Sequence, residues 1–156
     1  MVARLRAEIK QRRRFRSLEQ EAYLNLLRTA DALLARAELT LKPAGLTHTQ
    51  YNVLRILRGA SPEGLSCRQV AARMLTRDPD VTRLLDRLGA RGLVTRSREQ
   101  KDRRVLTVRI TPQGLRLLEG LDRLVAAMHR RLLGRIERPD LCLLVDLLEQ
   151  ARGTAR

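Results

Sequence analysis

A helix pattern followed at once by a charged hairpin pattern occupies the middle of this 156-residue chain, from Thr76 to Gly114, and constrains the fold more than any other stretch. Its first half has four apolar residues at the i, i+3, i+4, i+7 spacing of one helix face, namely Val81, Leu84, Leu85 and Leu88. We expect Asp78 to cap this helix, Pro79 to hold its first position and Gly92 to end it in left-handed backbone. The spacing therefore predicts a short amphipathic helix with a polar outer face.

The second half of this stretch has the alternation of a strand pair. Residues 93–95 begin one strand and residues 105–110 form the other, in which three apolar residues alternate with polar ones: Leu106, Val108 and Ile110. The connecting segment 96–104 has no apolar residue, so we expect this tip to project into solvent. Thr111 and Pro112 then stand as the cap and the first residue of another helix.

Signals for helix starts appear at three earlier places. Ser17, Thr47 and Ser66 are each followed three residues later by Gln, which is the pattern of a capping box. The first opens a long amphipathic helix that reaches about Leu41, and the other two open short helices. Three short helices and then a hairpin are the order of a winged helix-turn-helix, in which the last helix enters the major groove of DNA. We therefore predict a mainly α fold with a small β-wing.

The segments outside this unit predict helices that need a partner. A long amphipathic pattern follows the hairpin up to Ile136, and we expect Pro139 to break that helix. The last helix, Leu141 to Ala151, is apolar on two faces, which is more than its own chain can cover. We therefore expect a homodimer built from the first long helix and the last two. The basic arm, residues 1–16, fits a solvated tail, a phosphate contact or an extension of the first helix toward a partner subunit.

The charge of the chain indicates a polyanionic partner. The sequence has 32 Lys and Arg against 17 Asp and Glu, which gives a formal net charge of +15 and a pI of about 11.5. We expect double-stranded DNA as the partner, ahead of an anionic membrane; an Arg-rich, solvated surface is the alternative explanation. The N-terminus has no apolar signal segment and no apolar run approaches membrane length, so we expect a cytoplasmic protein without a membrane partner.

Side chains for catalysis or metal binding are sparse and scattered. Cys67 and Cys142 form no CxxC pair, and His48 and His129 have no metal-ligand spacing, so we expect no cofactor, no metal and no enzyme activity. We expect His48, inside a capping box, to be exposed. Cys67 stands in the first turn of a helix, where the dipole favours a thiolate, so both a redox-sensing role and an inert small residue fit it. Cys142 fits packing in a subunit interface.

Three segments resemble the MarR (multiple antibiotic resistance regulator) family of bacterial transcription factors. Residues 46–54, LTHTQYNVL, resemble the second helix of the family, and residues 81–88 followed by Gly92-Leu93-Val94 resemble its recognition helix. Residues 102–104, Asp-Arg-Arg, followed by residues 110–114, ITPQG, match its wing signature, with Ile110 for the usual Leu. The resemblance is specific over these motifs and extends in architecture from residue 17 to residue 152.

The resemblance implies an obligate dimer that binds pseudo-palindromic operators, commonly as a repressor, and that small phenolic or lipophilic effectors or oxidants often release. It implies one domain over 17–152, with a winged helix-turn-helix at 46–114 and dimerisation helices at 17–42 and 112–152. The effector would lie near four residues that also fit a plain core: Tyr23, Leu26, Tyr51 and Leu115. A sequence-independent architectural DNA-binding protein is the alternative function; it would keep the charge without needing an ordered wing.

Candidate DNA contacts come from the helix face and from the wing signature. Thr82, Arg83 and Arg87 lie off the apolar stripe, and Arg83 can pair with guanine through two hydrogen bonds, a phosphate contact being the alternative. By the resemblance, Arg104 enters the minor groove and Asp102 holds it in place. The remaining candidates serve phosphates or the helix start: Arg68, Gln69, Arg77, Asp80, Arg98, Lys101 and Arg103.

The residues Asp78 and Asp80 depart from the family pattern, which often has small hydroxyl residues here. Carboxylates close to DNA are unfavourable unless they cap the helix, accept from a cytosine amine or pair with a cation. We expect Asp78 to be the cap, which leaves Asp80 to pair with Arg77 or Arg83 or to influence base preference.

Overall fold

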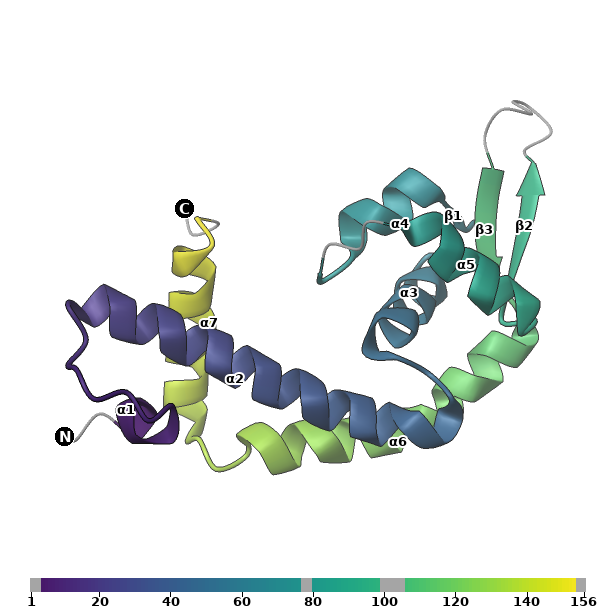
Figure 1. Cartoon of the computed structure of the whole chain (residues 1–156). Coiled ribbons are helices and arrows are strands. Elements are labelled where there is room, and N and C mark those ends of the chain that lie inside the picture. Colours follow the sequence, from purple (N-terminus) through teal and green to yellow (C-terminus); the bar gives the residue numbers. More distant parts are fainter. Residues whose placement is uncertain (1–3, 77–79, 99–105, 154–156) are drawn as a thin grey trace.

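Two long helices that lie side by side form the frame of the molecule. The computed structural model describes residues 4–76, 80–98 and 106–153. Helices α2 (Leu18–Leu41) and α6 (Pro112–Leu133) pack along each other and carry a lobe at one end and helix α7 (Arg138–Ala151) at the other (Figure 1). The other elements are α1 (Arg4–Glu8), η1 (Lys42–Ala44), α3 (His48–Gly59), β1 (Leu65–Ser66), α4 (Cys67–Arg73), α5 (Val81–Ala90), β2 (Val94–Arg98) and β3 (Leu106–Ile110). The predicted mainly α fold with a small β-wing is confirmed.

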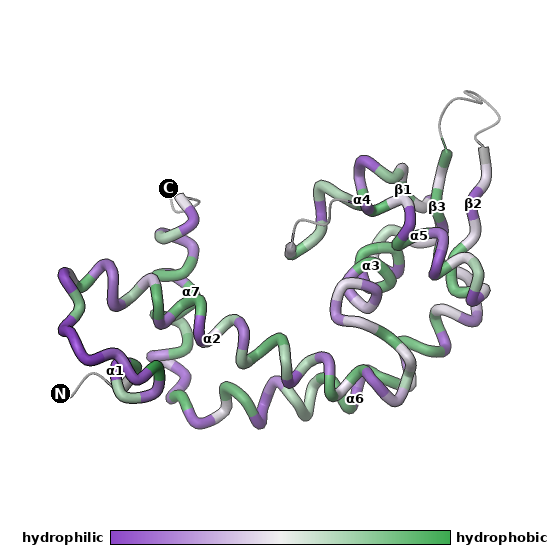
Figure 2. Tube along the Cα trace, in the orientation of Figure 1, coloured by the Kyte–Doolittle hydropathy of each residue, from purple (hydrophilic) through white to green (hydrophobic). Residues whose placement is uncertain are grey.

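Aliphatic side chains from every element of the lobe form its core. The largest fully buried ones are Leu41, Val53, Leu54, Leu57, Val70, Leu85, Leu88, Val108 and Leu118. Each such side chain contributes about 1.5–3 kcal/mol through its removal from water. Figure 2 shows apolar segments in the helices of the lobe and also along α2, α6 and α7, outside it. Among the described helices, none has both the length and the apolar content needed to cross a bilayer.

The hairpin belongs to a three-stranded antiparallel sheet of order β1-β3-β2. Val94 pairs with Ile110 and Arg98 with Leu106, which confirms the predicted strand pair. Strand β1 was not predicted because two residues are too short to show an alternation. It makes β3 the central strand, so Thr107, which the alternation assigned to the polar face, is only 3% exposed.

The helix starts follow the capping signals closely. Thr47 and Ser66 form complete capping boxes, in which the hydroxyl accepts from the Gln backbone N–H and the Gln side chain accepts from the cap N–H. At Ser17 the box is incomplete, because the Gln20 side chain accepts from the N–H of Arg16, at 2.7 Å, instead of from that of Ser17. The predicted starts of all three helices are nevertheless correct.

The two ends of the chain differ from expectation. Helix α6 ends at Leu133, so Ile136 lies beyond it, and α7 already begins at Arg138 with Pro139 in its first turn. The break therefore precedes the proline, whose missing N–H is tolerated in a first turn. In the basic arm, α1 is a separate short helix whose Leu5 is only 4% exposed. It is not a continuation of α2.

The two glycines of α6 predict opposite effects of the same substitution. A Cβ at Gly114 would lie 2.5 Å from the Leu93 carbonyl oxygen and 2.7 Å from Ile110 Cγ1, where α6 meets the sheet. Gly114→Ala should therefore lower the free energy of unfolding by about 1–3 kcal/mol through overpacking. At Gly120 nothing lies within 4 Å, so Gly120→Ala should raise it by about 0.5–1 kcal/mol. Urea denaturation of both variants checks this pair; equal effects would contradict it.

Candidate functional site

Helix α5 begins at Asp80, two residues later than predicted. Asp80 is the N-cap, with Oδ1 accepting from the backbone N–H of Arg83 at 3.0 Å. Its Oδ2 also forms an ion pair with Arg83 Nε at 3.0 Å. The prediction of Asp78 as cap is therefore wrong. Asp78 and Asp80 are both followed by a residue that could donate a backbone N–H three positions later. Only after Asp80 is that residue an arginine, whose side chain can also pair with the second carboxylate oxygen.

The end of α5 fits the sequence. Gly92 has a φ of 68°, and the N–H groups of Gly92 and Leu93 return to the carbonyls of Gly89 and Leu88 at 2.8 and 3.0 Å. These two bonds form a Schellman motif, which needs a left-handed residue and therefore favours glycine. The chain can then turn directly from α5 into β2.

The polar face of α5 is exposed on the surface of the lobe. Leu84, Leu85 and Leu88 are buried, whereas Thr82, Arg83 and Arg87 are exposed, as predicted. The Arg83 side chain is 79% exposed even though it pairs with Asp80. The helix thus presents a hydroxyl and two guanidinium groups on one side and holds them on a rigid apolar base.

A residue that the sequence analysis missed, Arg96, ties α5 to the hairpin. Its Nη1 lies 2.6 Å from Asp86 Oδ1, and its Nη2 donates to the Thr82 carbonyl oxygen at 3.0 Å. The lack of apolar residues in 96–104 predicts a place for Arg96 in the charged hairpin tip instead. The strand register indicates that the Arg96 side chain points toward α5 and not into solvent. Arg96 lies two residues after buried Val94 and hence on the same face of β2.

Other arginines of the lobe also form internal ties. Arg58 Nη1 donates to both carboxylate oxygens of Asp122, at 3.0 Å to Oδ1 and 2.9 Å to Oδ2, and so links α3 to α6. Arg91 donates to the carbonyls of Gly45 and Ala44 at 2.6 and 3.0 Å, which joins the end of α5 to the end of η1. Part of the positive charge of the lobe therefore serves the structure.

The loop and the turn that flank α4 are held in similar ways. Arg109 donates to the Pro62 carbonyl oxygen at 3.2 Å and to the Ser97 hydroxyl, which fastens the loop before β1 to the sheet. Asn52 is 3% exposed, and its Oδ1 accepts from the N–H of Leu75 at 3.0 Å, just after α4. Neither role can be predicted from the sequence, because each depends on residues that lie far apart along the chain.

The remaining predicted DNA contacts lie partly in α4 and partly outside the described residues. Arg68 and Gln69 are exposed in α4, but the Gln69 side-chain oxygen accepts from the Ser66 N–H at 2.8 Å and serves the cap. Arg98 ends β2, and its side chain lies outside the described structure. Five more candidates also lie outside the described residues: Arg77, Lys101, Asp102, Arg103 and Arg104.

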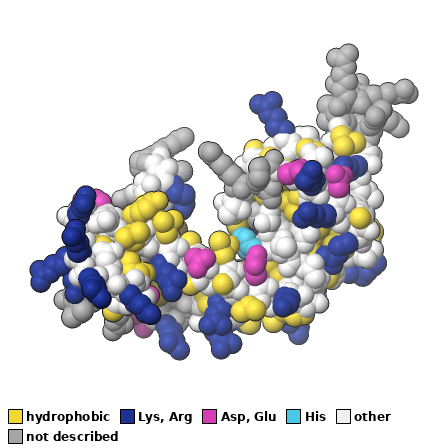
Figure 3. Space-filling model, viewed as in Figure 1, with side chains coloured by type: hydrophobic (Ala, Val, Ile, Leu, Met, Phe, Trp, Pro, Cys, Tyr) yellow, Lys and Arg dark blue, Asp and Glu magenta, His cyan; other side chains and the backbone are white. Residues whose placement is uncertain are grey.

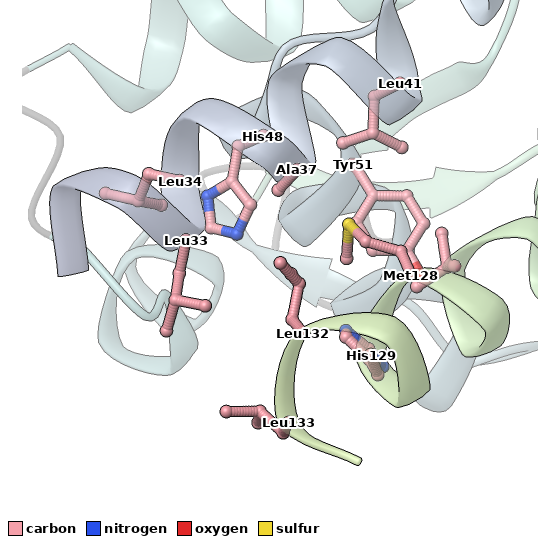
Figure 4. Close-up of a pocket in the computed structure, with 11 residues that line it drawn as sticks. Leu33, Leu34, Ala37, Leu41, His48, Tyr51, Met128, His129, Leu132 and Leu133 are labelled. Carbon is pink, nitrogen blue, oxygen red and sulfur yellow. The ribbon is translucent and has the colours of Figure 1, made fainter. Parts of the chain in front are cut away.

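A cavity of about 200 Å³ lies where α2 and α6 meet α3 (Figure 4). Its lining is apolar except for two histidines and a tyrosine hydroxyl: Leu33, Leu34, Ala37, Leu41, His48, Tyr51, Val125, Met128, His129, Leu132 and Leu133. Of the four predicted effector residues, only Tyr51 lines it. Tyr23 and Leu26 are 61% and 42% exposed nearer the start of α2, and Leu115 packs against the lobe core.

The pocket gives His48 a different environment from the one predicted. Its ring points into the cavity and is half-buried rather than exposed (Figure 4). Burial lowers the pKa of His48 below its ordinary value of 6.5, and the nearby charge of Arg55 acts in the same direction, while Glu38 opposes both. At neutral pH the ring is therefore uncharged and offers one hydrogen-bond donor and one acceptor to the pocket.

Apolar side chains remain uncovered at the end of the molecule remote from the lobe. In α7, Leu143, Val145 and Leu147 are 55%, 49% and 50% exposed. Figure 3 shows apolar patches over α1, α2 and α7 with arginines and lysines around them. The predicted excess of apolar surface on α7 is therefore present in the single chain.

The cysteines lie apart from each other. Cys67 is the first residue of α4 and is half-buried against the core, and Cys142 is exposed on α7. Within the described ranges, no three His, Cys, Asp or Glu side chains come together as a metal site would require.

Comparisons with known proteins agree on one family. Residues 44–105 match the sequence model of the MarR family. A MarR transcription factor from Planctomyces limnophilus is 45% identical with a TM-score of 0.68, over 88% of this chain and 99% of that one. CouR from Rhodococcus jostii RHA1, whose crystal structure contains p-coumaroyl-CoA, is 30% identical with a TM-score of 0.74, over 88% and 95%. The HTH-type transcriptional regulator FarR of Neisseria gonorrhoeae is 27% identical over 81% of this chain and 86% of its own length.

Proposed function

Because the chain belongs to the MarR family, whose members are transcription regulators and not enzymes, we propose that it represses transcription as a homodimer that binds one pseudo-palindromic operator and that a small lipophilic molecule releases. It would act in the cytoplasm, where the bacterial chromosome lies. The observation that carries the proposal is the geometry of α5, a rigidly capped helix with an exposed face of Thr82, Arg83 and Arg87.

Base recognition would centre on Arg83. It is the third residue of α5, and the N-terminal residues of a recognition helix contact base edges. Asp80 engages its Nε, which leaves the two terminal nitrogens for the O6 and N7 atoms of guanine. The same ion pair offsets the charge of Asp80, so the carboxylate does not act as an isolated repulsive charge beside DNA. Arg87 and Arg68 are better placed as phosphate contacts.

Dimerisation would use the helices outside the lobe, over 17–42 and 112–152. Their exposed apolar side chains include Leu143 and Leu147, which are four residues apart and hence on one face of α7. A second copy is the occupant that fits this surface best, because two-fold symmetry would also place two α5 helices for the two halves of a pseudo-palindrome. Such a dimer covers the operator and so can block transcription.

The effector would occupy the pocket between α2, α3 and α6. Its aliphatic walls suit an aromatic or other lipophilic group, and His48 and Tyr51 offer a few polar atoms for orientation. Leu41 and Val125 line the pocket and also belong to the lobe core. A ligand that displaces them would therefore shift the lobe relative to the long helices.

Selection of operators from a random pool of duplexes, followed by anisotropy titrations, tests the DNA proposal. We expect enrichment of a pseudo-palindrome, two chains per duplex, and a preference of about a thousandfold or more over a shuffled duplex at physiological salt. Arg83→Ala should shrink that preference by about 5- to 150-fold, since a bidentate base contact contributes about 1–3 kcal/mol. Arg55→Ala, which removes the same charge from an exposed position of α3 outside the proposed dimer helices, is the control. Equal binding to every duplex would favour an architectural protein instead.

Sedimentation velocity tests the dimer. The 17.8 kDa chain should sediment with about twice its own mass. The pair Leu143→Glu and Leu147→Glu should shift it to a single chain, because buried carboxylates are strongly disfavoured. Leu75→Glu, which changes a 67% exposed leucine of the lobe, should leave the dimer intact. A wild-type protein that sediments as a single chain at micromolar concentration would end this part of the proposal.

Thermal shift and operator displacement with phenolic carboxylic acids and their CoA thioesters, p-coumaroyl-CoA included, test the effector pocket. We expect a member of this panel to raise the Tm and to weaken operator binding by about 5- to 150-fold. His48→Leu should reduce both effects by removing the two imidazole nitrogens that His48 contributes to the pocket. Thr40→Ala should change neither, because the Thr40 hydroxyl donates to the Arg36 carbonyl oxygen within α2. Ligands that stabilise the protein without changing operator binding would contradict the release mechanism.

A further inference from the structure

We infer that Arg96 and Asp86 together are positioning residues for sequence recognition: they set the orientation of α5 against the hairpin and thereby the specificity of the protein for its operator. The inference rests on the proposed sequence-specific DNA binding and adds residues that contact the recognition helix and need not contact a base. It follows from the two short contacts of Arg96, at 2.6 Å to Asp86 and 3.0 Å to the Thr82 carbonyl oxygen.

The two contacts of Arg96 fall on successive turns of α5. Thr82 and Asp86 are four residues apart, so they lie one above the other on one edge of the helix. A planar guanidinium that holds both points resists rotation and tilting of the helix in a way that a single ion pair cannot. The buried leucines of α5 hold it by non-directional apolar contacts. Directional contacts come from Arg91 at the C-terminal end of the helix and from Arg96 along its first two turns, beside the residues proposed to reach DNA.

The opposite edge of the polar face carries the residues proposed to reach DNA. Arg83 and Arg87 are also four residues apart, and each is one position after Thr82 or Asp86. The ends of these side chains lie several ångströms from the axis of α5. A rotation of the helix by about 20° would therefore move them by more than roughly 0.5 Å, which is the tolerance of a preorganised site. The edge held by Arg96 therefore controls where the other edge points.

Arg96 also offsets a carboxylate on the DNA-facing helix. The Asp86 side chain is 57% exposed and would repel phosphates if it stood alone. The Arg96 side chain is 26% exposed; its backbone belongs to β2 and its guanidinium group contacts two residues of α5. Because both groups are partly solvated, the pair itself adds little to stability; its value lies in geometry and charge balance.

Three variants separate the geometric role of Arg96 from its role in charge balance, in titrations with the selected operator and a shuffled duplex. Arg96→Met should lower affinity for both duplexes, through unpaired Asp86, and should shrink the preference by about tenfold, which corresponds to about 1.4 kcal/mol. Adding Asp86→Asn to Arg96→Met should restore shuffled-duplex affinity but not the preference. Arg96→Lys keeps the charge and loses the two-point contact, so it should bind shuffled DNA normally and still lose preference.

Arg58→Met is the matched control, because it breaks the other Arg–Asp pair of the lobe, between α3 and α6, with the same loss of charge. It should change the Tm and leave the preference unchanged. The inference is overturned if Arg96→Lys retains full preference, or if Arg58→Met and Arg96→Met reduce it equally. A wild-type protein without any preference would instead overturn the proposed function. Should Arg96→Met fail to fold by circular dichroism, Arg96→Lys still decides the outcome.

Discussion

The burial of one helix stripe, Leu84, Leu85 and Leu88, is the contact on which the functional surface depends. These side chains are at most 7% exposed and join α5 to the rest of the lobe core. Because they occupy one face of a ten-residue helix, they force the opposite face outward. The polar ties at Asp80 and Arg96 then fix the helix start and restrict the rotation of the helix beyond what burial alone sets. Packing thus decides which face points outward, and directional contacts refine the orientation of that face.

Arginine has two uses in this protein, and the net charge of +15 does not distinguish them. Arg58 and Arg91 connect elements that lie far apart in the sequence, through a carboxylate or backbone carbonyls. Arg96 connects β2 to α5, the element that precedes it in the chain. Arg83 and Arg87 stay exposed. The chain has few aromatic residues, and planar guanidinium groups join neighbouring elements at the lobe surface by hydrogen bonds and ion pairs. An estimate of DNA affinity from total charge would therefore count arginines that already have partners.

Features set by neighbouring residues were predictable from the sequence, and features set by distant pairing were not. The caps at Thr47 and Ser66, the stripe of α5 and the left-handed Gly92 follow from local spacing and are confirmed. Thr107 is buried although the local alternation assigns it to the polar face, and its strand pairs with β1, which lies far away in the sequence. Likewise, the His48 ring points into a pocket whose other walls come from α2 and α6. The local capping-box pattern around His48 carries no information about these two helices. Asp78 and Asp80 could not be separated as caps until the partner of the second oxygen was known.

Helix α3 connects the pocket with the lobe elements that we propose to face DNA. His48 and Tyr51 of α3 line the cavity, while Val53, Leu54 and Leu57 of the same helix are completely buried in the lobe core. A close-packed core transmits displacement instead of absorbing it, so a ligand that moves the start of α3 would also move α4 and the sheet, which pack on that helix. The separation of two α5 helices in a dimer would change with it. Such coupling needs no contact between ligand and DNA, only a ligand that fits one arrangement of α3 better than the other.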